Sequence, residues 1–498
     1  MTFHTHPSEV IHHEVPRQVM IQALRRHLPE DGLLWEESEL CPFECDGLYA
    51  YRRTPWLVAL PETREQVRSV LIECRERGVP VVIRGAGTGL SGGALPLDKG
   101  VLLSLTRLNR ILEIDPANRM ARVEPGVTNA AITQAAANHG LYYAPDPSSQ
   151  IACSIGGNVA ENAGGVHCLK YGLTVHNIQR LKFFTMEGEE ITAGGTGLEG
   201  PGLDLLALMT GSEGLLGVVT EITVKLLPVP ESARVLLAAF DDIGKAAAAV
   251  AAVIQAGLVP AGLEMMDRFA IHAVEDFMRV GYPREAEAIL LCEVDGTEAQ
   301  VEDESVVAQQ VLEQAGAFEV RVSRNEAERR RFWAGRKAAF PAMGKITPDY
   351  YCMDGTIPRH RLAEVLAGIA RLSEKYQLKV ANVFHAGDGN LHPLIIYDGS
   401  IPGALEKTER LGAEILELCV RVGGTITGEH GVGIEKINQM CVQFGREELQ
   451  QFHAVKQAFD PRGLLNPGKA VPTLARCAEF GAMHVHKGQL PHPELERF

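Results

Sequence analysis

Two short segments in the second half of the chain contain side chains that bind cations and move protons. In the segment HAGDGNLH, His385 and His392 flank Asp388-Gly389, a dipeptide that favours a two-residue β-turn. A turn at these two residues sets His385 opposite His392, with Cβ atoms about 5 Å apart. Imidazoles at that separation can chelate one cation, although two ordinary sheet histidines are the alternative. The first segment therefore predicts a histidine pair that binds a metal.

The second segment, TGEHGVG, places Glu429 and His430 among closely spaced glycines. A set of His385, His392 and Glu429 supplies three protein ligands and leaves positions open for a substrate. His430 can act as a base, because histidine titrates near neutral pH. A helix-capping turn with an exposed histidine is the alternative reading of this segment. Together the two segments predict metal-assisted removal of a proton.

Arg336, in the segment RFWAGRKAAFP, is the candidate for binding a substrate carboxylate. A planar guanidinium grips a carboxylate through two parallel hydrogen bonds. The alternative is an arginine in a surface salt bridge. If the first interpretation holds, the substrate is an organic acid.

The chain also has a glycine-rich loop, GAGTGLSGG at residues 85–93, directly after a predicted strand. Gly87, Gly89 and Gly92 match the dinucleotide-binding spacing GxGxxG, but that motif requires a helix at the last glycine. Here the following residues lead to another strand, so we exclude NAD binding. The loop still lets backbone N–H groups approach an anion such as a pyrophosphate, against the alternative of a merely flexible loop.

A second loop, residues 142–165, is rich in Gly, Pro, Ser and Asn and is too long for a simple connection. A third motif, TGSEGLLGVVTEI, begins at Thr210. In this order the three motifs resemble the PCMH-type FAD-binding domain of the vanillyl-alcohol oxidase superfamily, over about residues 50 to 228. The resemblance implies two α+β subdomains that hold FAD between them. Members with covalent flavin carry a histidine where this chain has Thr88, so the FAD is expected to be non-covalent.

Carried over by motif, the expected FAD contacts lie in all three segments. They are Arg84, Gly85, Ala86, Gly87, Thr88, Gly89, Leu90, Ser91, Gly92, Gly93, Pro145, Asp146, Pro147, Ser148, Ser154, Gly156, Gly157, Asn158, Asn162, Gly164, Gly165, Glu213 and Ile222.

The histidine segments, followed by LLNPGK, resemble the metal-dependent branch that oxidises D-lactate, D-2-hydroxyglutarate and glycolate. The resemblance implies a divalent zinc, manganese or iron ion on His385, His392 and Glu429, with His430 taking the hydroxyl proton. Hydride from substrate C2 would pass to flavin N5. The whole chain is most similar to the glycolate dehydrogenase group of that branch. Apolar Pro393 and Leu394 after the second histidine favour a small monocarboxylate, glycolate or D-lactate.

The expected fold class is α+β, and the resemblance implies a ferredoxin-like substrate domain after the FAD domain and a helical C-terminal segment. Hydrophobic periodicity and the Pro-rich stretch near residue 230 suggest the divisions. They are a helical lead-in (1–50), the FAD-binding domain (51–230), the substrate domain (231–420), the helical segment returning to the flavin (421–472) and a tail (473–498). His484 and His486 in the tail are not taken as ligands.

Composition excludes several classes of function. A formal net charge of -15 argues against nucleic acid as a partner. The ten cysteines are scattered without a CxxC pair, so no iron–sulfur or zinc framework is expected in the chain. No apolar stretch reaches the length of about 18 residues that suggests a membrane-spanning helix. The N-terminus lacks a signal peptide, so reduced thiols and a cytoplasmic location are expected.

Reduced flavin needs an electron acceptor, and the chain offers no haem or iron–sulfur motif of its own. The family resemblance implies a second FAD-type subunit and an iron–sulfur subunit that lead electrons towards quinone, with at most peripheral association with the inner membrane. Three alternatives remain: a D-2-hydroxy acid dehydrogenase acting alone, an aromatic-alcohol oxidase, and a redox-silent structural subunit. An FMN-dependent L-2-hydroxy acid oxidase is excluded, because its barrel needs eight strand–helix repeats.

Overall fold

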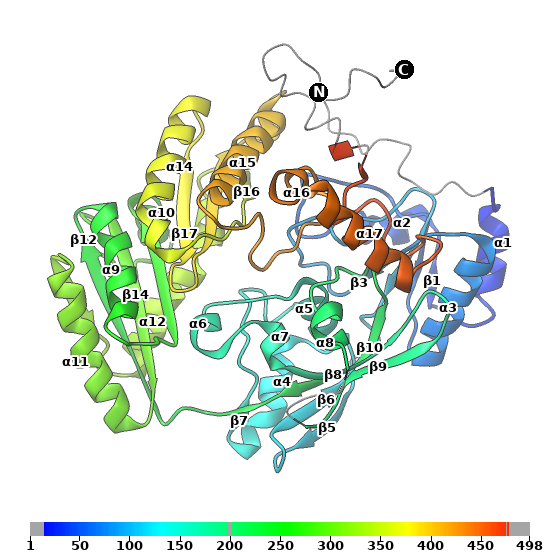
Figure 1. Ribbon diagram of the computed structural model, residues 1–498, viewed down its shortest axis with the longest axis horizontal. Coiled ribbons are helices and arrows are strands. Elements are labelled where there is room, and N and C mark those ends of the chain that lie inside the picture. The colour runs from blue at the N-terminus through cyan, green and yellow to red at the C-terminus, as the bar shows by residue number, and fades with distance from the viewer. Residues whose placement is uncertain (1–13, 198–201, 475, 478–498) are drawn as a thin grey trace.

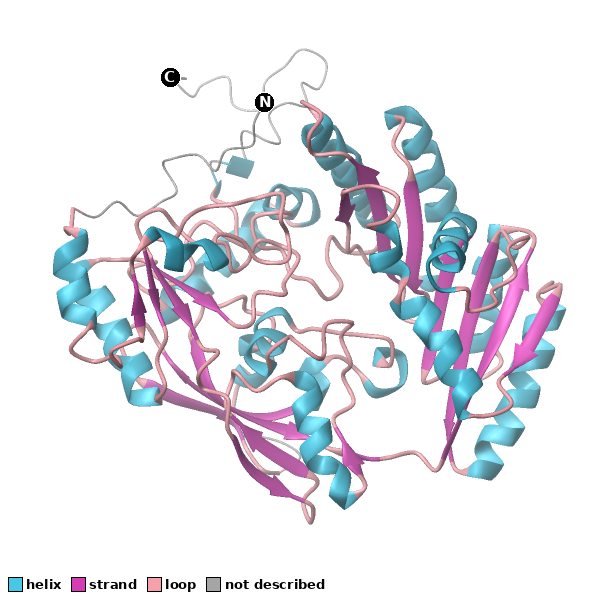
Figure 2. Ribbon diagram, turned by 180° about the vertical axis from the view of Figure 1, so that it is seen from behind, coloured by secondary structure: helices cyan, strands magenta, loops and turns pink. Residues whose placement is uncertain are grey.

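Two lobes make up the protein in a computed structural model that describes residues 14–197, 202–474 and 476–477 (Figure 1). The first lobe contains a four-stranded and a five-stranded sheet. The second lobe contains one seven-stranded sheet, and the last helices of the chain lie back against the first lobe (Figures 1 and 2). This mixed arrangement of helices and strands confirms the predicted α+β class.

The four-stranded sheet holds the first glycine-rich loop at the end of its edge strand. Helix α3 (Arg64–Arg77) begins at a capping box of Thr63 and Gln66 and ends at Gly78 in the left-handed conformation. Its buried apolar side chains pack on the sheet, in one core with the N-terminal helix. In spatial order the strands are β1 (Leu33–Leu34), β2 (Leu57–Ala59), β4 (Val101–Ser104) and β3 (Val81–Arg84). The helices before β2 are α1 (Arg17–Leu24), α2 (Glu37–Leu40) and the 3-10 turn η2 (Cys41–Phe43).

The glycine-rich loop after β3 leads to β4 through turns and without a helix. The predicted strand after the loop is therefore present, and the helix that a Rossmann motif requires does not begin at the last glycine.

The five-stranded antiparallel sheet carries the second and third motifs in its connections. Its strands are β5 (Ile111–Asp115), β6 (Met120–Val123), β10 (Val218–Lys225), β8 (Ile178–Phe184) and β9 (Glu190–Gly194). A small pair, β7 (Leu141–Tyr142) with β11 (Leu227–Pro228), lies where the chain leaves the lobe. The helical pieces are α4 (Asn129–Ala136), η3 (Ala137–His139), α5 (Ile155–Glu161), α6 (Cys168–Tyr171), α7 (Thr174–Asn177) and α8 (Leu205–Met209).

The seven-stranded sheet begins with the β-α-β-β-α-β order of a ferredoxin-like unit, with one extra helix inserted. Strands β17, β18 and β16 extend it on one side. In spatial order the strands are β15 (Glu319–Val322), β12 (Ser232–Phe240), β14 (Ala288–Gly296), β13 (Gly262–Asp267), β17 (Val380–His385), β18 (Asn390–Tyr397) and β16 (Asp349–Cys352).

Helices cover both faces of this sheet, so its strands are apolar on both sides. In β12, for example, Leu236 and Ala238 belong to one core while Val235 and Leu237 belong to the other. One face packs under α9 (Ile243–Gln255), α11 (Glu298–Gln314) and α14 (Leu362–Tyr376), which follows η4 (Arg359–Arg361). The other packs under α10 (Arg268–Met278), α12 (Glu326–Lys337) and α13 (Ala339–Met343).

The C-terminal helices join the two lobes. Helix α15 (Ala404–Arg421) packs beside α14, and α16 (Ile437–Gln443) and α17 (Arg446–Phe459) then cross to the first lobe (Figure 1). There Lys456 Nζ donates to the Leu215 carbonyl at 2.7 Å, and Leu465 forms a bridge with Val81 of β3. The loop that carries Glu429 and His430 lies within this crossing segment.

The expectation that the cysteines are all reduced thiols is wrong for one pair. Cys441 on α16 and Cys477 form a disulfide that closes 36 residues, with Cα atoms 5.3 Å apart. No local pattern predicts this disulfide, because the second cysteine lies in the tail, where no element was predicted. The two tail histidines considered above lie outside the described residues. Among the described helices, none is long and apolar enough to cross a membrane.

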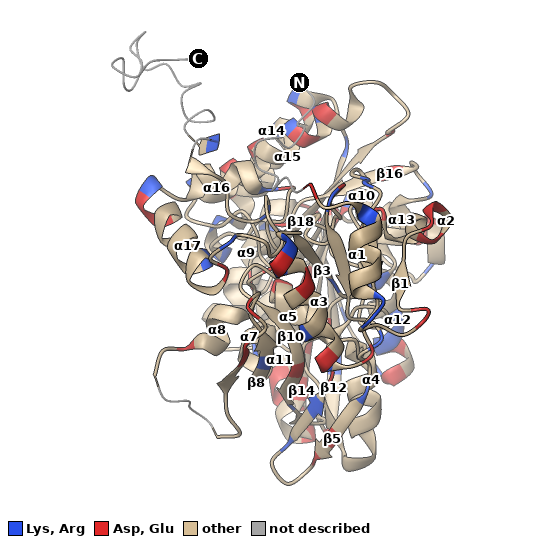
Figure 3. Cartoon of the chain, turned by 90° about the vertical axis from the view of Figure 1, so that its right-hand side faces the viewer, with Lys and Arg blue, Asp and Glu red and all other residues tan. Residues whose placement is uncertain are grey.

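Acidic and basic residues alternate along the elements in the view of Figure 3.

Candidate active site

A cavity of about 400 Å³ lies between the glycine-rich loops of the first lobe and the segment that carries Glu429 and His430. Most of the predicted FAD contacts line it. They are Gly85, Ala86, Gly87, Thr88, Gly89, Leu90, Gly93, Pro147, Ser148, Ser154, Gly156, Gly157, Asn158 and Glu213.

The remaining predicted contacts do not line this cavity: Arg84, Ser91, Gly92, Pro145, Asp146, Asn162, Gly164, Gly165 and Ile222. Ile222 is fully buried in β10, in the hydrophobic core of the sheet. Arg84 instead donates to the Cys45 carbonyl at 2.7 Å, which braces the start of the first loop. Arg84 and Ile222 therefore contribute to the structure around the cavity and do not line it.

Several lining residues were missed by sequence reasoning, among them Asp46, Glu161, Lys337 and Phe340. Asp46 precedes the FAD-domain motifs, and Lys337 and Phe340 belong to the second lobe, so no local motif marks them. Glu161 does have a signal, since it is a carboxylate inside the glycine- and asparagine-rich second loop.

The cavity fits an extended phosphate-bearing cofactor such as FAD. An added Cβ at Gly89 would meet no atom within 4 Å, so this residue leaves backbone open to the cavity. Asn158 Nδ2 and Glu161 Oε2 are buried on the wall without a hydrogen-bond partner among the described residues. Open backbone and unpaired polar atoms are what a bound cofactor would satisfy.

The predicted hairpin exists, but its register is different from the one expected. The structure pairs His385 with Asn390 and Val383 with His392, so the turn spans four residues instead of two. The shift is two residues, and side chains alternate faces with a period of two, so both histidines still lie on the same face. They are diagonal neighbours with ring centroids 4.9 Å apart.

Glu429 completes the predicted cluster. His392 Nε2 lies 2.9 Å from Glu429 Oε1, and His385 Nε2 lies 3.3 Å from the same oxygen. The three ligand atoms all lie within 4.8 Å of one another. Two imidazoles and a carboxylate at this spacing fit a divalent zinc, manganese or iron ion.

A buried carboxylate behind the cluster orients its first histidine. Glu264 of β13 accepts from His385 Nδ1 at 2.7 Å, and its other oxygen pairs with Arg336 Nη2 at 2.7 Å. Burial would raise the pKa of Glu264, but His385 and Arg336 lower it, so the carboxylate stays ionised. This arrangement presents Nε2 of His385 to a metal.

Arg336, the predicted substrate clamp, is thus engaged on one edge by Glu264. The side chain is buried, and its Nε atom has no hydrogen-bond partner among the described residues. Its neighbour on α12, Lys337, lines the cavity, whereas Arg336 does not. The clamp role therefore remains a prediction.

The loop with Glu429 and His430 is held by two buried carboxylates. Asp354, directly after β16, accepts from the backbone N–H groups of Gly428 at 3.0 Å and His430 at 2.9 Å. Burial alone would raise the pKa of Asp354, but positively charged neighbours lower this pKa to about 2. Among these neighbours, Lys436 is the one that stays charged. On the far side of the loop Glu213 accepts from the backbone N–H groups of Val432 and Gly433, each at 2.7 Å.

His430 lies between the metal candidates and the cavity. Its ring stacks on that of His392 with centroids 4.9 Å apart and planes 15° apart, and it lines the cavity beside Glu429. Burial lowers the pKa of His430 to about 4, although Asp354 opposes the shift. A neutral imidazole in this position can accept a proton from a group held at the metal cluster.

Comparison with known proteins identifies the family of the chain. The family model described as "FAD binding domain" matches residues 55–194, and "FAD linked oxidases, C-terminal domain" matches residues 229–470. The chain is 64% identical to the glycolate oxidase subunit GlcD of Escherichia coli strain K12 over 97% of each protein. It belongs to the FAD-linked oxidase family. The chain is also 34% identical to a D-lactate dehydrogenase of Anaerostipes hadrus, covering 90% of this chain and 96% of the relative.

Solved structures show the same fold at low sequence identity. The chain aligns with p-cresol methylhydroxylase at a TM-score of 0.77 and 18% identity, and the alignment covers 92% of this chain and 97% of the other. It aligns with 4-ethylphenol oxidase from Gulosibacter chungangensis at a TM-score of 0.76 and 17% identity, covering 92% and 98%. These likenesses confirm the PCMH-type architecture.

Proposed function

We propose that this FAD-dependent oxidoreductase oxidises glycolate to glyoxylate, and D-lactate to pyruvate, with His430 as the base. The observation that carries the proposal is that His385, His392 and Glu429 lie close enough together to hold a cation, while Glu429 and His430 line the cavity. Family membership supports the broader statement that the chain oxidises 2-hydroxy acids with FAD.

Each protein group has one task in this reaction. When bound, FAD supplies the hydride acceptor and a divalent cation supplies a Lewis acid for the substrate hydroxyl. His430 accepts the hydroxyl proton at Nε2 while its own proton stays on Nδ1. Glu264 holds the His385 ring in place, and the open edge of Arg336 is proposed to receive the substrate carboxylate.

The finer parts of the proposal concern cofactors and partners. Thr88 offers no nucleophilic ring nitrogen for attachment, so we propose non-covalent FAD. We also propose that electrons leave through a second FAD-type subunit and an iron–sulfur subunit towards quinone, in the cytoplasm or peripherally on the inner membrane. The relative from Escherichia coli is named a subunit, which supports a complex. A dehydrogenase that acts alone and a redox-silent structural subunit are the competing functions.

We also propose that the FAD-binding domain ends and the substrate domain begins at about residue 230. Strand β12 begins at Ser232, and the second family model begins at residue 229. The proposed helical lead-in ends at residue 50, and the proposed substrate domain ends at residue 420. The helical segment that returns to the flavin then ends at residue 472, where the tail begins.

A dye-reduction assay tests the proposed function. The purified chain, loaded with FAD, is given an artificial electron acceptor and glycolate, D-lactate, L-lactate or D-2-hydroxyglutarate, before and after treatment with a chelator. We expect turnover with glycolate and D-lactate that is lost on chelation and returns with added metal. Turnover with L-lactate or D-2-hydroxyglutarate alone, or no turnover with any of the four acids, contradicts the proposal.

A further inference from the structure

The second ring nitrogen of His392 has no partner in the metal cluster. Nε2 of this histidine lies 2.9 Å from Glu429 Oε1, whereas Nδ1 is buried without a hydrogen-bond partner among the described residues. The residue is only 2% exposed, so bulk water does not satisfy the nitrogen. In a neutral ring with Nε2–H donating to Glu429, Nδ1 carries an open lone pair. Such a buried acceptor requires an explanation.

His430 repeats the same feature on a parallel ring. Its Nε2 lies 3.8 Å from Glu429 Oε1, and its Nδ1 is also buried without a partner in the described part of the chain. The two rings stack with planes only 15° apart. Both imidazoles therefore have one nitrogen near Glu429 and a second one left over.

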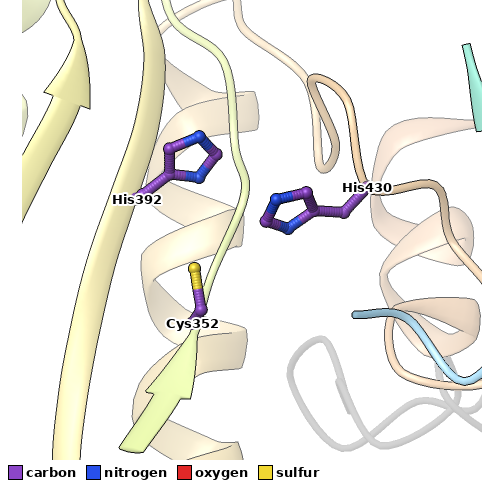
Figure 4. A group of neighbouring side chains, drawn as sticks. All are labelled: Cys352, His392 and His430. Carbon is purple, nitrogen blue, oxygen red and sulfur yellow. The ribbon is translucent and has the colours of Figure 1, made fainter. Parts of the chain in front are cut away.

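A thiol lies beside these two rings. Cys352 ends β16, where it pairs with Leu394 of β18, two residues from His392. Figure 4 shows its sulfur pointing to the space beside the rings of His392 and His430. One ligand atom from each of the three residues lies within 4.8 Å of the others. The Cys352 thiol has only a weak contact of its own, to the Met353 carbonyl at 3.4 Å.

We propose that Cys352, His392 and His430 form a second cation site, which takes a thiophilic divalent cation such as Zn²⁺ or Cd²⁺ in competition with the cluster of His385, His392 and Glu429. One sulfur and two imidazole nitrogens are the ligands such cations prefer, and water can complete a tetrahedron. Burial raises the pKa of the Cys352 thiol, and the carboxylates of Asp354, Glu435 and Glu429 near it favour a positive charge, whereas Lys436 opposes one. Binding replaces the thiol proton of Cys352 by the cation, and that proton passes to solvent.

Competition follows from the chemistry of imidazole. A neutral ring that binds a cation through Nδ1 keeps its proton on Nε2. His392 bound in this way cannot ligate the other cluster, and His430 bound in this way cannot accept a proton at Nε2. A cation in the second site therefore inhibits the proposed reaction twice, by displacing the first cation and by blocking the base. This consequence rests on the proposed function, but the existence of the site does not.

Cadmium difference spectroscopy tests the site independently of activity. The full-length, FAD-loaded protein is stripped of metal with a chelator, desalted and titrated with Cd²⁺, and the cadmium–thiolate charge-transfer band is recorded. The variants are Cys352→Ser, Cys352→Ala, His385→Asn and, as a matched control, Cys292→Ser. Cys292 is another buried cysteine on a strand of the same sheet. Flavin content and thermal unfolding verify that each variant is folded.

We expect a saturable thiolate band in the parent protein, Cys292→Ser and His385→Asn that is absent from both Cys352 variants. A second arm measures inhibition of dye reduction by excess Zn²⁺, which Cys352→Ala should weaken roughly 10- to 100-fold. A band that persists in the folded Cys352 variants, or no saturable band in the parent protein, overturns the site. If the band depends on Cys352 but excess Zn²⁺ does not inhibit an active enzyme, the proposed competition between the two cation sites is wrong. If the chain turns over no 2-hydroxy acid, the proposed function fails while the band remains.

Discussion

The two sides of the candidate active site are built from different parts of the polypeptide. On the flavin side the wall is mostly backbone, contributed by glycine-rich loops such as the one around Gly89. On the substrate side it is made of ionisable side chains on adjacent strands and a crossing loop, each held by another buried charge. A backbone wall depends on the absence of side chains, and a side-chain cluster depends on its supporting partners. Substitutions should therefore affect the two sides in different ways.

The largest effect is expected on the substrate side, from His430→Gln. Loss of the base should lower the rate of flavin reduction by about 10²- to 10⁴-fold while FAD stays bound, because His430 stacks on His392 and does not hold the glycine-rich loops. Stopped-flow absorbance of the flavin measures the rate. The exposed His360, on η4, is the control for a histidine-to-glutamine change. A rate within threefold of the parent protein would remove His430 from the mechanism.

A second test removes the charge that holds the loop, with Asp354→Asn. The loss of a buried acceptor for several backbone N–H groups beside Lys436 should lower the free energy of unfolding by about 3–5 kcal/mol. Denaturant unfolding followed by fluorescence gives the value. Asp398→Asn at an exposed turn serves as the control, and its free energy of unfolding should change far less than that of Asp354→Asn. Equal stability of the two variants would show that the loop does not depend on Asp354.

A smaller effect is expected from Glu264→Gln, which keeps the size of the side chain but removes its charge. The His385 ring then loses its ionised partner, so metal affinity should fall roughly 10- to 100-fold. Competition with a chelating dye measures the affinity, and FAD content should be unchanged. Glu293→Gln, which alters a buried carboxylate of the neighbouring strand that contacts His167 and Arg329, is the matched control. Parallel loss of metal in both variants would count against a specific role for Glu264.

The smallest effect belongs to the flavin side. Gly89→Ala adds a methyl group where no protein atom lies within 4 Å, so the fold should tolerate it while FAD binding weakens about tenfold. Fluorescence of released FAD during dilution reports the affinity. Gly195→Ala, where an added Cβ would make only an ordinary contact with the Gly197 backbone nitrogen at 3.9 Å, is the control. If Gly89→Ala binds FAD as tightly as the control, the cofactor does not pass over this residue.

The same contrast explains how much the sequence could predict. Motif order identified the loops of the flavin side, because spacing of glycines is visible in the sequence. The histidine pair was found despite a wrong register, since an error of two residues preserves the face of the strand. The ferredoxin-like unit of the second lobe was expected from the family resemblance, but the strands added to that unit could not be placed in advance.

The supporting residues could not be found from local patterns. Glu264 lies more than a hundred residues from His385, and they meet only because β13 pairs with β17. A carboxylate inside the apolar strand of Gly262–Asp267 is a usable signal, since buried charges need partners. Asp354 and Cys352 likewise reach the site only through the pairing of β16 with β18. The disulfide had no local signal of any kind.

The central claim is that a bound cation and His430 act on the 2-hydroxyl of a small acid beside the flavin. Anaerobic mixing of the FAD-loaded protein with glycolate, D-lactate or L-lactate, with flavin absorbance as the readout, tests it most directly. We predict bleaching by glycolate and D-lactate only, lost after chelation and restored by a divalent metal. Bleaching that survives complete removal of metal would contradict the account.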